Sequence, residues 1–179
     1  MRFLLLLALA ACAPKTAPVT DTTSRPTTLA ALQVPLDTGI VRDAPPAFVD
    51  GLTQALASRG LAATSLQATE LPEGFDTRRA AAFRGVALAE GAGQPVVLVE
   101  AVARYFSPLN GQFRWEVEVT ATVADPALPE GVVSKTFTVP VFLRFQHQDE
   151  ADAIAMSTAV VQRRVAKLVD AALGPEAPR

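Results

Sequence analysis

The chain has few of the residues on which most metal and redox chemistry depends. Its 179 residues include one cysteine, Cys12, and one histidine, His147. An internal disulfide requires two cysteines, and a zinc or copper site requires several cysteine or histidine ligands, so the sequence predicts neither. We therefore expect no metal and no cofactor, and the stability of the fold has to come from its hydrophobic core.

Basic and acidic residues are nearly equal in number, and the N-terminal apolar run is short. The 16 basic and 18 acidic residues give a formal net charge of −2, which provides no basic footprint for nucleic acid. The apolar run that begins at Phe3 ends before Pro14. It is roughly half as long as the run of about 20 apolar residues that a membrane-spanning helix needs. The composition thus excludes a nucleic-acid partner and argues against a transmembrane helix.

The first twelve residues have the features of a bacterial secretory signal. Arg2 precedes the apolar run, and Leu9-Ala10-Ala11-Cys12 resembles a lipobox, in which two small residues precede the cysteine that is diacylated and becomes the mature N-terminus. We expect residues 1–11 to be the signal peptide and Cys12 to carry the lipid. The alternative is an ordinary signal peptide that is cleaved elsewhere, with Cys12 lost or left as a free thiol.

Lipid on Cys12 would determine where the protein works. Several acyl chains bury enough methylene groups to make membrane attachment effectively permanent. Ala13, in place of an aspartate after the cysteine, predicts sorting to the outer membrane with the domain facing the periplasm.

Composition divides the remaining chain into a tether, one domain and a tail. Residues 12–28 are rich in Ala, Pro, Thr and Ser, which favours a disordered tether. Residues 29–174 have the length and hydrophobicity of a single domain with its own core, and residues 175–179 form a short tail.

Three helices are predicted within the domain. The first begins near Asp43, a possible N-cap, and ends at Gly60. The second spans residues 76–90, with Gly85 as an unfavourable residue in its interior. The third spans residues 150–173, with Asp149 as a possible N-cap. Two short strands are expected at residues 29–36 and 61–66.

The clearest pattern is a strict alternation of apolar and polar residues between Val96 and Phe145. A period of two predicts three antiparallel strands that bury one face, joined by turns rich in Pro, Gly, Asn and Asp. The register that keeps apolar residues together places Tyr105 opposite Trp115 and Val123 opposite Val133. The third strand contains Pro140, which favours an edge position or a bulge because proline cannot donate a ladder hydrogen bond.

These elements predict an α+β fold, a two-layer sandwich of a mainly antiparallel sheet with two or three helices on one face. The first and third helices are expected to cover the face that carries Trp115. The opposite face of the same strands carries an unusual set of apolar residues. Either the protein's own loops and its second helix cover them, or they form an exposed patch that contacts a partner or ligand. The members of this set are Val96, Leu98, Val102, Phe106 and Phe142.

Residues with catalytic potential lack the context that catalysis requires. His147 has no accompanying Gly-x-Ser-x-Gly motif, and its position between the last strand and the last helix is typical of an exposed or capping residue. Glu116 and Glu118 share one strand face, where Arg104 and Arg114 balance their charge. We therefore expect no enzymatic activity, and we would revise this if a His147→Ala substitution abolished one.

The order of these elements resembles that of small bacterial envelope lipoproteins. The lipobox, the tether, the strand starting at Thr136-Phe137-Thr138-Val139 and the acidic start of the last helix are similar to the lipoprotein subunit of the lipopolysaccharide-transport complex (LptE) and to auxiliary lipoproteins of lipid-transport ABC systems. Arg59-Gly60-Leu61 and Val97-Leu98-Val99-Glu100 also resemble domains of the curli-secretion and TolB N-terminal type. Neither resemblance assigns a role to a residue.

This resemblance implies a non-enzymatic accessory or assembly factor that binds a protein partner in an envelope transport or biogenesis complex. A second hypothesis is a lipid or small-ligand carrier, which would use an apolar pocket on the face of Val96, Leu98 and Phe142. A pore is disfavoured because three strands cannot close a barrel alone and one face of the sheet has to seat the helices.

Overall fold

The computed structural model describes residues 24–38, 40–75, 80–109, 111–145 and 147–174. Its centre is the predicted antiparallel meander, formed by β4 (Val96–Leu109), β5 (Gln112–Ala124) and β6 (Val132–Leu143). The predicted register is confirmed, since Tyr105 pairs with Trp115 and Val123 pairs with Val133. Strand β6, with Pro140, is an edge strand, as expected.

Parallel pairing extends the sheet beyond the meander. Strand β1 (Arg25–Gln33) pairs in parallel with β4 on one side and with β3 (Leu61–Ser65) on the other, and the two-residue strand β2 (Arg42–Asp43) pairs with the end of β1. The prediction for the first strand was wrong in its limits, because β1 begins at Arg25 and not at residue 29. Residues 25–28, which their polar composition assigned to the tether, therefore belong to the sheet, where all four pair with β3 and Thr28 also pairs with β4.

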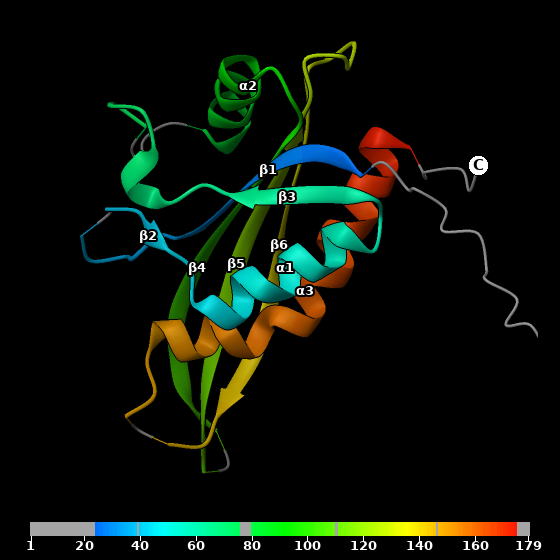
Figure 1. Cartoon of the computed structure of the whole chain (residues 1–179). Helices are drawn as coiled ribbons and strands as arrows, with labels where there is room; N and C mark the ends of the chain where they lie inside the picture. Colours follow the sequence, from blue (N-terminus) through cyan, green and yellow to red (C-terminus); the bar gives the residue numbers. More distant parts are fainter. Residues whose placement is uncertain (1–23, 39, 76–79, 110, 146, 175–179) are drawn as a thin grey trace, which may run out of the picture.

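Two helices cover one face of this sheet (Figure 1). Helix α1 (Pro46–Ala57) and helix α3 (Glu150–Leu173) lie side by side, and a Cβ atom placed on Gly51 of α1 would lie 2.4 Å from Cγ2 of Thr158 in α3. The limits of α3 agree with the prediction, and Asp149 caps it by accepting hydrogen bonds from the backbone N–H groups of Ala151 and Asp152. Glycine thus allows the two helices to approach closely.

The predicted cap of the first helix is wrong. Pro45 occupies the N-cap position of α1, and the carboxylate of Asp43 accepts a hydrogen bond from the backbone N–H of Ala68, at 2.6 Å. Residues 68–70 form a short 3-10 helix, so Asp43 fastens this distant segment instead of starting α1. The pairing of Asp43 in β2 positions its side chain for this contact.

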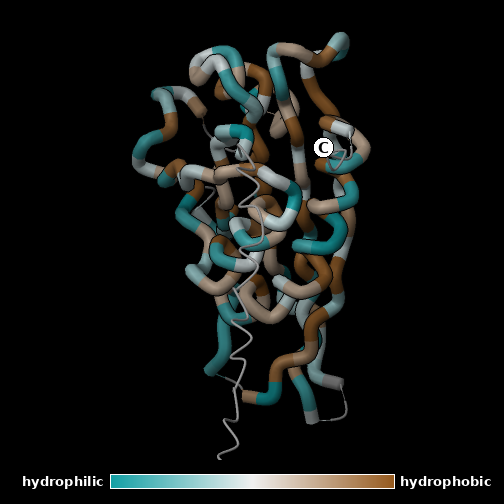
Figure 2. Tube along the Cα trace, turned by 45° about the vertical axis from the view of Figure 1, so that its right-hand side comes forward, coloured by the Kyte–Doolittle hydropathy of each residue, from teal (hydrophilic) through white to brown (hydrophobic). Residues whose placement is uncertain are grey.

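The main core lies between the sheet and the helices α1 and α3. Phe48 and Leu52 of α1, Ile154 and Val161 of α3, and the inward residues of the strands, such as Val117, are fully buried there. Figure 2 shows that hydrophobic residues concentrate along the strands, while hydrophilic residues are common on the helices and in the loops. The α+β class is confirmed, with two helices on the face of Trp115.

Helix α2 (Ala81–Ala92) lies on the opposite face of the sheet. It begins later than predicted; the expected cap, Asp76, lies outside the described residues. It ends at Gly93, which adopts a left-handed conformation (φ 64°), and not at Gly91. Gly85, an unfavourable residue for a helix interior, faces Thr122 of β5, so the close approach of α2 to the sheet explains the glycine.

Candidate functional site

The five residues predicted to form a contact face do not share one environment. Val96 and Leu98 have no exposed surface, because they pack in a second core with Ala89 of α2. Helix α2 and the segment around the 3-10 helix close this part of the sheet. The prediction that Val96 and Leu98 contact a ligand or partner is therefore wrong, and the ligand-carrier hypothesis loses these two residues from its apolar face.

The other end of the same face is exposed. The side chains of Phe106 and Phe142 are 60% and 42% exposed, and Val102 is half-buried. Arg114 pairs with Phe142 across β5 and β6, and its guanidinium carbon lies 4.4 Å from the centre of the Phe106 ring. Val102, Phe106, Arg114 and Phe142 are called the hairpin-end surface below, because they lie toward the turn that joins β4 to β5.

Local irregularity of β4 shapes the hairpin-end surface. The register between β4 and β5 shifts between Tyr105 and Ser107, so Phe106 is the bulged residue. The bulge turns Phe106 toward Arg114, whose Nη2 donates to Oε1 of Glu116 at 2.6 Å. The arginine is therefore held in place from both sides, by a ring and by a carboxylate.

Aromatic residues also occupy the other side of this end of the sheet. Tyr105 is 50% exposed and packs edge-on against Trp115, with ring centres 5.6 Å apart. Beyond β6, the ring of exposed His147 stacks on exposed Phe145 at 5.5 Å. Within the part of the chain that the structure describes, no group of three or more His, Cys, Asp or Glu residues is placed to hold a metal ion.

A buried ion pair joins α2 to the sheet. Arg84 of α2 and Glu100 of β4 are 3% and 7% exposed, and Nη2 of Arg84 donates to Oε1 of Glu100. Burial raises the pKa of Glu100, and the charge and hydrogen bond of Arg84 oppose this effect. Sequence reasoning missed this pair. The available signal was a glutamate within an apolar strand and an arginine within an alanine-rich helix.

A second site that sequence reasoning missed is a groove between the C-terminal halves of α1 and α3. It has a volume of about 740 Å³ and is lined by Arg59 and by the α3 residues Arg163, Arg164 and Lys167, together with Gln54, Ala55, Ser58, Val160, Gln162 and Ala166. None of these lining residues is acidic. We call it the basic groove.

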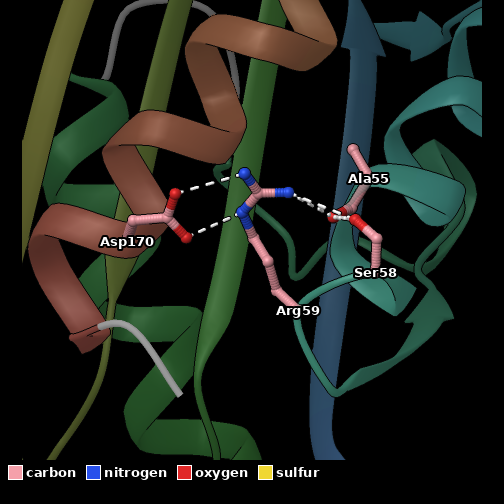
Figure 3. Close-up of polar contacts among 4 residues, drawn as sticks. All are labelled: Ala55, Ser58, Arg59 and Asp170. Carbon is pink, nitrogen blue, oxygen red and sulfur yellow. Dashed lines mark hydrogen bonds and ion pairs between the residues drawn. The ribbon is translucent and has the colours of Figure 1, made fainter. Parts of the chain in front are cut away.

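Arg59 is held rigidly at one end of the basic groove (Figure 3). Its Nε and Nη2 atoms donate to the two carboxylate oxygens of Asp170, at 2.7 and 3.1 Å, and its Nη1 donates to the backbone oxygen of Ala55 and to Oγ of Ser58. This bidentate ion pair connects the segment that directly follows α1 to the last turns of α3. It also neutralises Asp170, the acidic residue nearest to the groove in the last turns of α3.

The three basic residues of α3 differ in their surroundings. The guanidinium carbon of Arg164 lies 4.7 Å from the centre of the Phe137 ring, which holds it against β6. Arg163 and Lys167 are exposed and lie one helical turn apart. Because residues four apart share one side of a helix, both face the basic groove.

The opposite ends of the two helices have the opposite charge. A groove of about 640 Å³ beside the start of α1 is lined by Asp43 and Asp50 together with Gln33 and Ala151. Glu150 and Asp152 occupy the first turn of α3, where their negative charge interacts favourably with the partial positive charge of the helix N-terminus. The layer formed by α1 and α3 is therefore acidic where its helices begin and basic toward their ends.

Cys12 lies outside the described residues, so its lipidation stays a prediction. None of the described helices combines the length and the hydrophobicity that spanning a membrane requires.

No protein-family model and no curated protein matches the chain. The fold is similar to solved structures of low sequence identity. One is PelC from Paraburkholderia phytofirmans, solved as a dodecamer (15% identity, 86% of this chain and 89% of that chain, TM-score 0.42). A second is protein XCC0632 from Xanthomonas campestris, of the DUF330 type (14% identity, 87% and 90%, TM-score 0.42). A third is lipoprotein GNA1162 from Neisseria meningitidis (15% identity, 79% and 98%, TM-score 0.41).

Bacterial lipoproteins are thus among the solved structures to which this chain is similar. The narrower resemblance to the lipopolysaccharide-transport and TolB types is not supported by these comparisons. At this level of similarity, no residue role is transferred to this chain.

Proposed function

We propose that this chain is a non-enzymatic bacterial lipoprotein, anchored through Cys12 in the outer membrane with its domain in the periplasm. It serves as an accessory or assembly factor of an envelope transport or biogenesis complex, and it binds a protein partner through the hairpin-end surface. The signal sequence and lipobox support the anchor. The exposed aromatic residues of the hairpin-end surface support the binding of a protein partner.

The main support for a partner at the hairpin-end surface is the exposure of two phenylalanines, Phe106 and Phe142, on either side of Arg114. Phe106 and Phe142 are exposed at 60% and 42%, although Val96 and Leu98 on the same face of the sheet are completely buried. Aromatic side chains and arginine are enriched at the centres of protein interfaces, where burial of the rings supplies much of the binding energy. Arg114 is fixed by Phe106 and Glu116, so little side-chain entropy would be lost when a partner covers it.

The anchor is tested by growing cells with radiolabelled palmitate. We expect label in the wild-type protein and none in a Cys12→Ser variant. A wild-type protein that is secreted without label, and without membrane association, would overturn the anchor and leave the partner to be tested separately.

The partner is tested by site-specific photocrosslinking in the native envelope. A photoreactive phenylalanine analogue at position 106 or 142 is expected to crosslink to the same envelope protein. Met156 of α3 is a matched control, because it is also apolar and is 63% exposed but lies outside the hairpin-end surface. Absence of a crosslink from both positions, or the same crosslinks from position 156, would contradict the proposal.

A further inference from the structure

The basic groove lies beside the point where the chain enters the fold. The backbone N–H of Arg25, the first residue of β1, donates to the backbone oxygen of Gly60 at 2.7 Å, and Gly60 directly follows Arg59. Figure 1 shows β1 beginning next to the C-terminal ends of α1 and α3. The residues that lead back to Cys12 therefore join the domain at the edge of the basic groove.

Covalent geometry limits the distance between this edge and the proposed anchor. Residues 13–24 can span at most about 45 Å when fully extended, so Arg25 stays within that distance of Cys12. A domain tethered here can bring the basic groove to the membrane surface. The hairpin-end surface lies toward the other end of β4, with Phe106 about 30 Å from Val96 along the strand.

Stabilisation of α3 does not explain the basic residues of the groove. Positive charge interacts favourably with the last turn of a helix, and the effect fades within that turn. The last turn of α3, which ends at Leu173, contains no basic residue. Arg163 and Lys167 lie before it, and both are exposed to solvent in a groove without acidic lining residues. Their charge is therefore available to a ligand.

We infer that the basic groove binds the phosphate groups of anionic phospholipids in the membrane that carries the protein. This inference rests on the proposed anchor at Cys12, which brings the groove to that membrane. Arg163 and Lys167 contact the headgroups directly, while Asp170 holds Arg59 and Phe137 holds Arg164 along the same groove. The domain then stands on the membrane with its basic end, and the hairpin-end surface points toward the protein partner.

The experiment measures binding of the mature chain to vesicles in the absence of the lipid anchor. The chain from residue 12 onward, with Cys12→Ser, is sedimented with vesicles of phosphatidylcholine alone or of phosphatidylcholine with phosphatidylglycerol at low salt. We expect binding only to the anionic vesicles. Each basic residue near an anionic surface contributes about fivefold in affinity, so Arg163→Gln with Lys167→Gln should weaken binding about 25-fold.

A matched control removes the same charge at the other end of the molecule. Arg104 and Arg144 are exposed and lie near the hairpin-end surface, so Arg104→Gln with Arg144→Gln should change binding by less than about threefold. Circular dichroism checks that both double variants fold. Equal loss in the two double variants would show attraction through net charge alone and would overturn the role of the basic groove, as would equal binding to both kinds of vesicle.

Two further readouts separate the remaining outcomes. Thermal stabilisation by inorganic phosphate that needs Arg163 and Lys167, without binding to anionic vesicles, would identify a site for a free anion and overturn the membrane role. The palmitate experiment tests the anchor independently. Selective vesicle binding by a protein that incorporates no palmitate would sustain the groove as a headgroup site and refute the anchor of the proposed function.

Discussion

Gly85 lies in the interior of α2 because the helix approaches β5 too closely for a larger residue. A Cβ atom at this position would lie 2.7 Å from Cγ2 of Thr122 and 3.5 Å from Cβ of Ala124. The first distance is a clash and the second an ordinary contact. Thr122 is fully buried, and its Oγ1 forms a 2.8 Å hydrogen bond with Oγ of Ser134, so its methyl group cannot turn away without cost.

These distances predict the stability of three variants. Gly85→Ala gains about 1 kcal/mol of helix propensity but loses about 2–3 kcal/mol to overpacking, a net loss of about 1–2 kcal/mol. Thr122→Ser removes only the methyl group and keeps the hydroxyl, at a cost of about 1 kcal/mol. In the double variant the new Cβ fills the space of the lost methyl group. Its stability should therefore be within about 0.5 kcal/mol of the wild type, a coupling energy of about 2 kcal/mol.

Urea unfolding followed by fluorescence of Trp115, the only tryptophan, measures these stabilities. Gly91→Ala is the matched control, because Gly91 belongs to the same helix and no atom lies within 4 Å of a Cβ placed there. It should gain about 0.5–1 kcal/mol. If Gly85→Ala stabilised the protein as much as Gly91→Ala does, α2 would not pack on β5 as described. Val96 and Leu98 would then again be candidates for contact.

Three further predictions concern the core, the helix cap and the buried ion pair. Phe48→Ala, which empties a fully buried site, should lower the free energy of unfolding by about 3–5 kcal/mol, whereas Met156→Ala should change it by less than about 0.5 kcal/mol; similar losses would contradict the placement of α1. Asp149→Ala should cost about 1 kcal/mol in the same urea assay, while Asp149→Asn, which can still cap, should cost less. Because burial raises the pKa of Glu100 in the folded state, that state binds the proton more tightly than the unfolded chain does. Relative to Glu100→Gln, the wild type should therefore lose stability as the pH rises from about 4.5 through the raised pKa; parallel pH profiles of the two urea midpoints would refute this.

Sequence reasoning succeeded where neighbouring residues carry the information. The alternation in the meander determines which side chains share a face, and a slip of one residue would expose the whole apolar set, so pairs such as Tyr105 with Trp115 could be predicted. The limits of α3 were equally predictable, since Asp149 supplies its cap and Gly174 ends it. Both signals act over a few residues and need no knowledge of distant segments.

Candidate contact residues were harder to predict because burial depends on what packs from elsewhere. Val96 and Phe106 look alike in the alternating pattern, and only the position of α2 buries the first and leaves the second exposed. The same holds for Glu100, which has the place of a solvated strand residue until Arg84 is packed against it. An apolar pattern identifies a face, but it does not identify what covers that face.

Residues close together along the chain were enough to predict the three meander strands with their register and the last helix. The secretory signal with its lipobox is also a local pattern, and it stays a prediction from the sequence. The packing of distant segments was needed to show that polar residues 25–28 form a strand, that α2 covers Val96 and Leu98 of the predicted contact face, and that Arg59 lies beside Arg163 and Lys167. These features arise from contacts between segments far apart in sequence. Their geometry is set by the packing of the whole core, which no local pattern specifies.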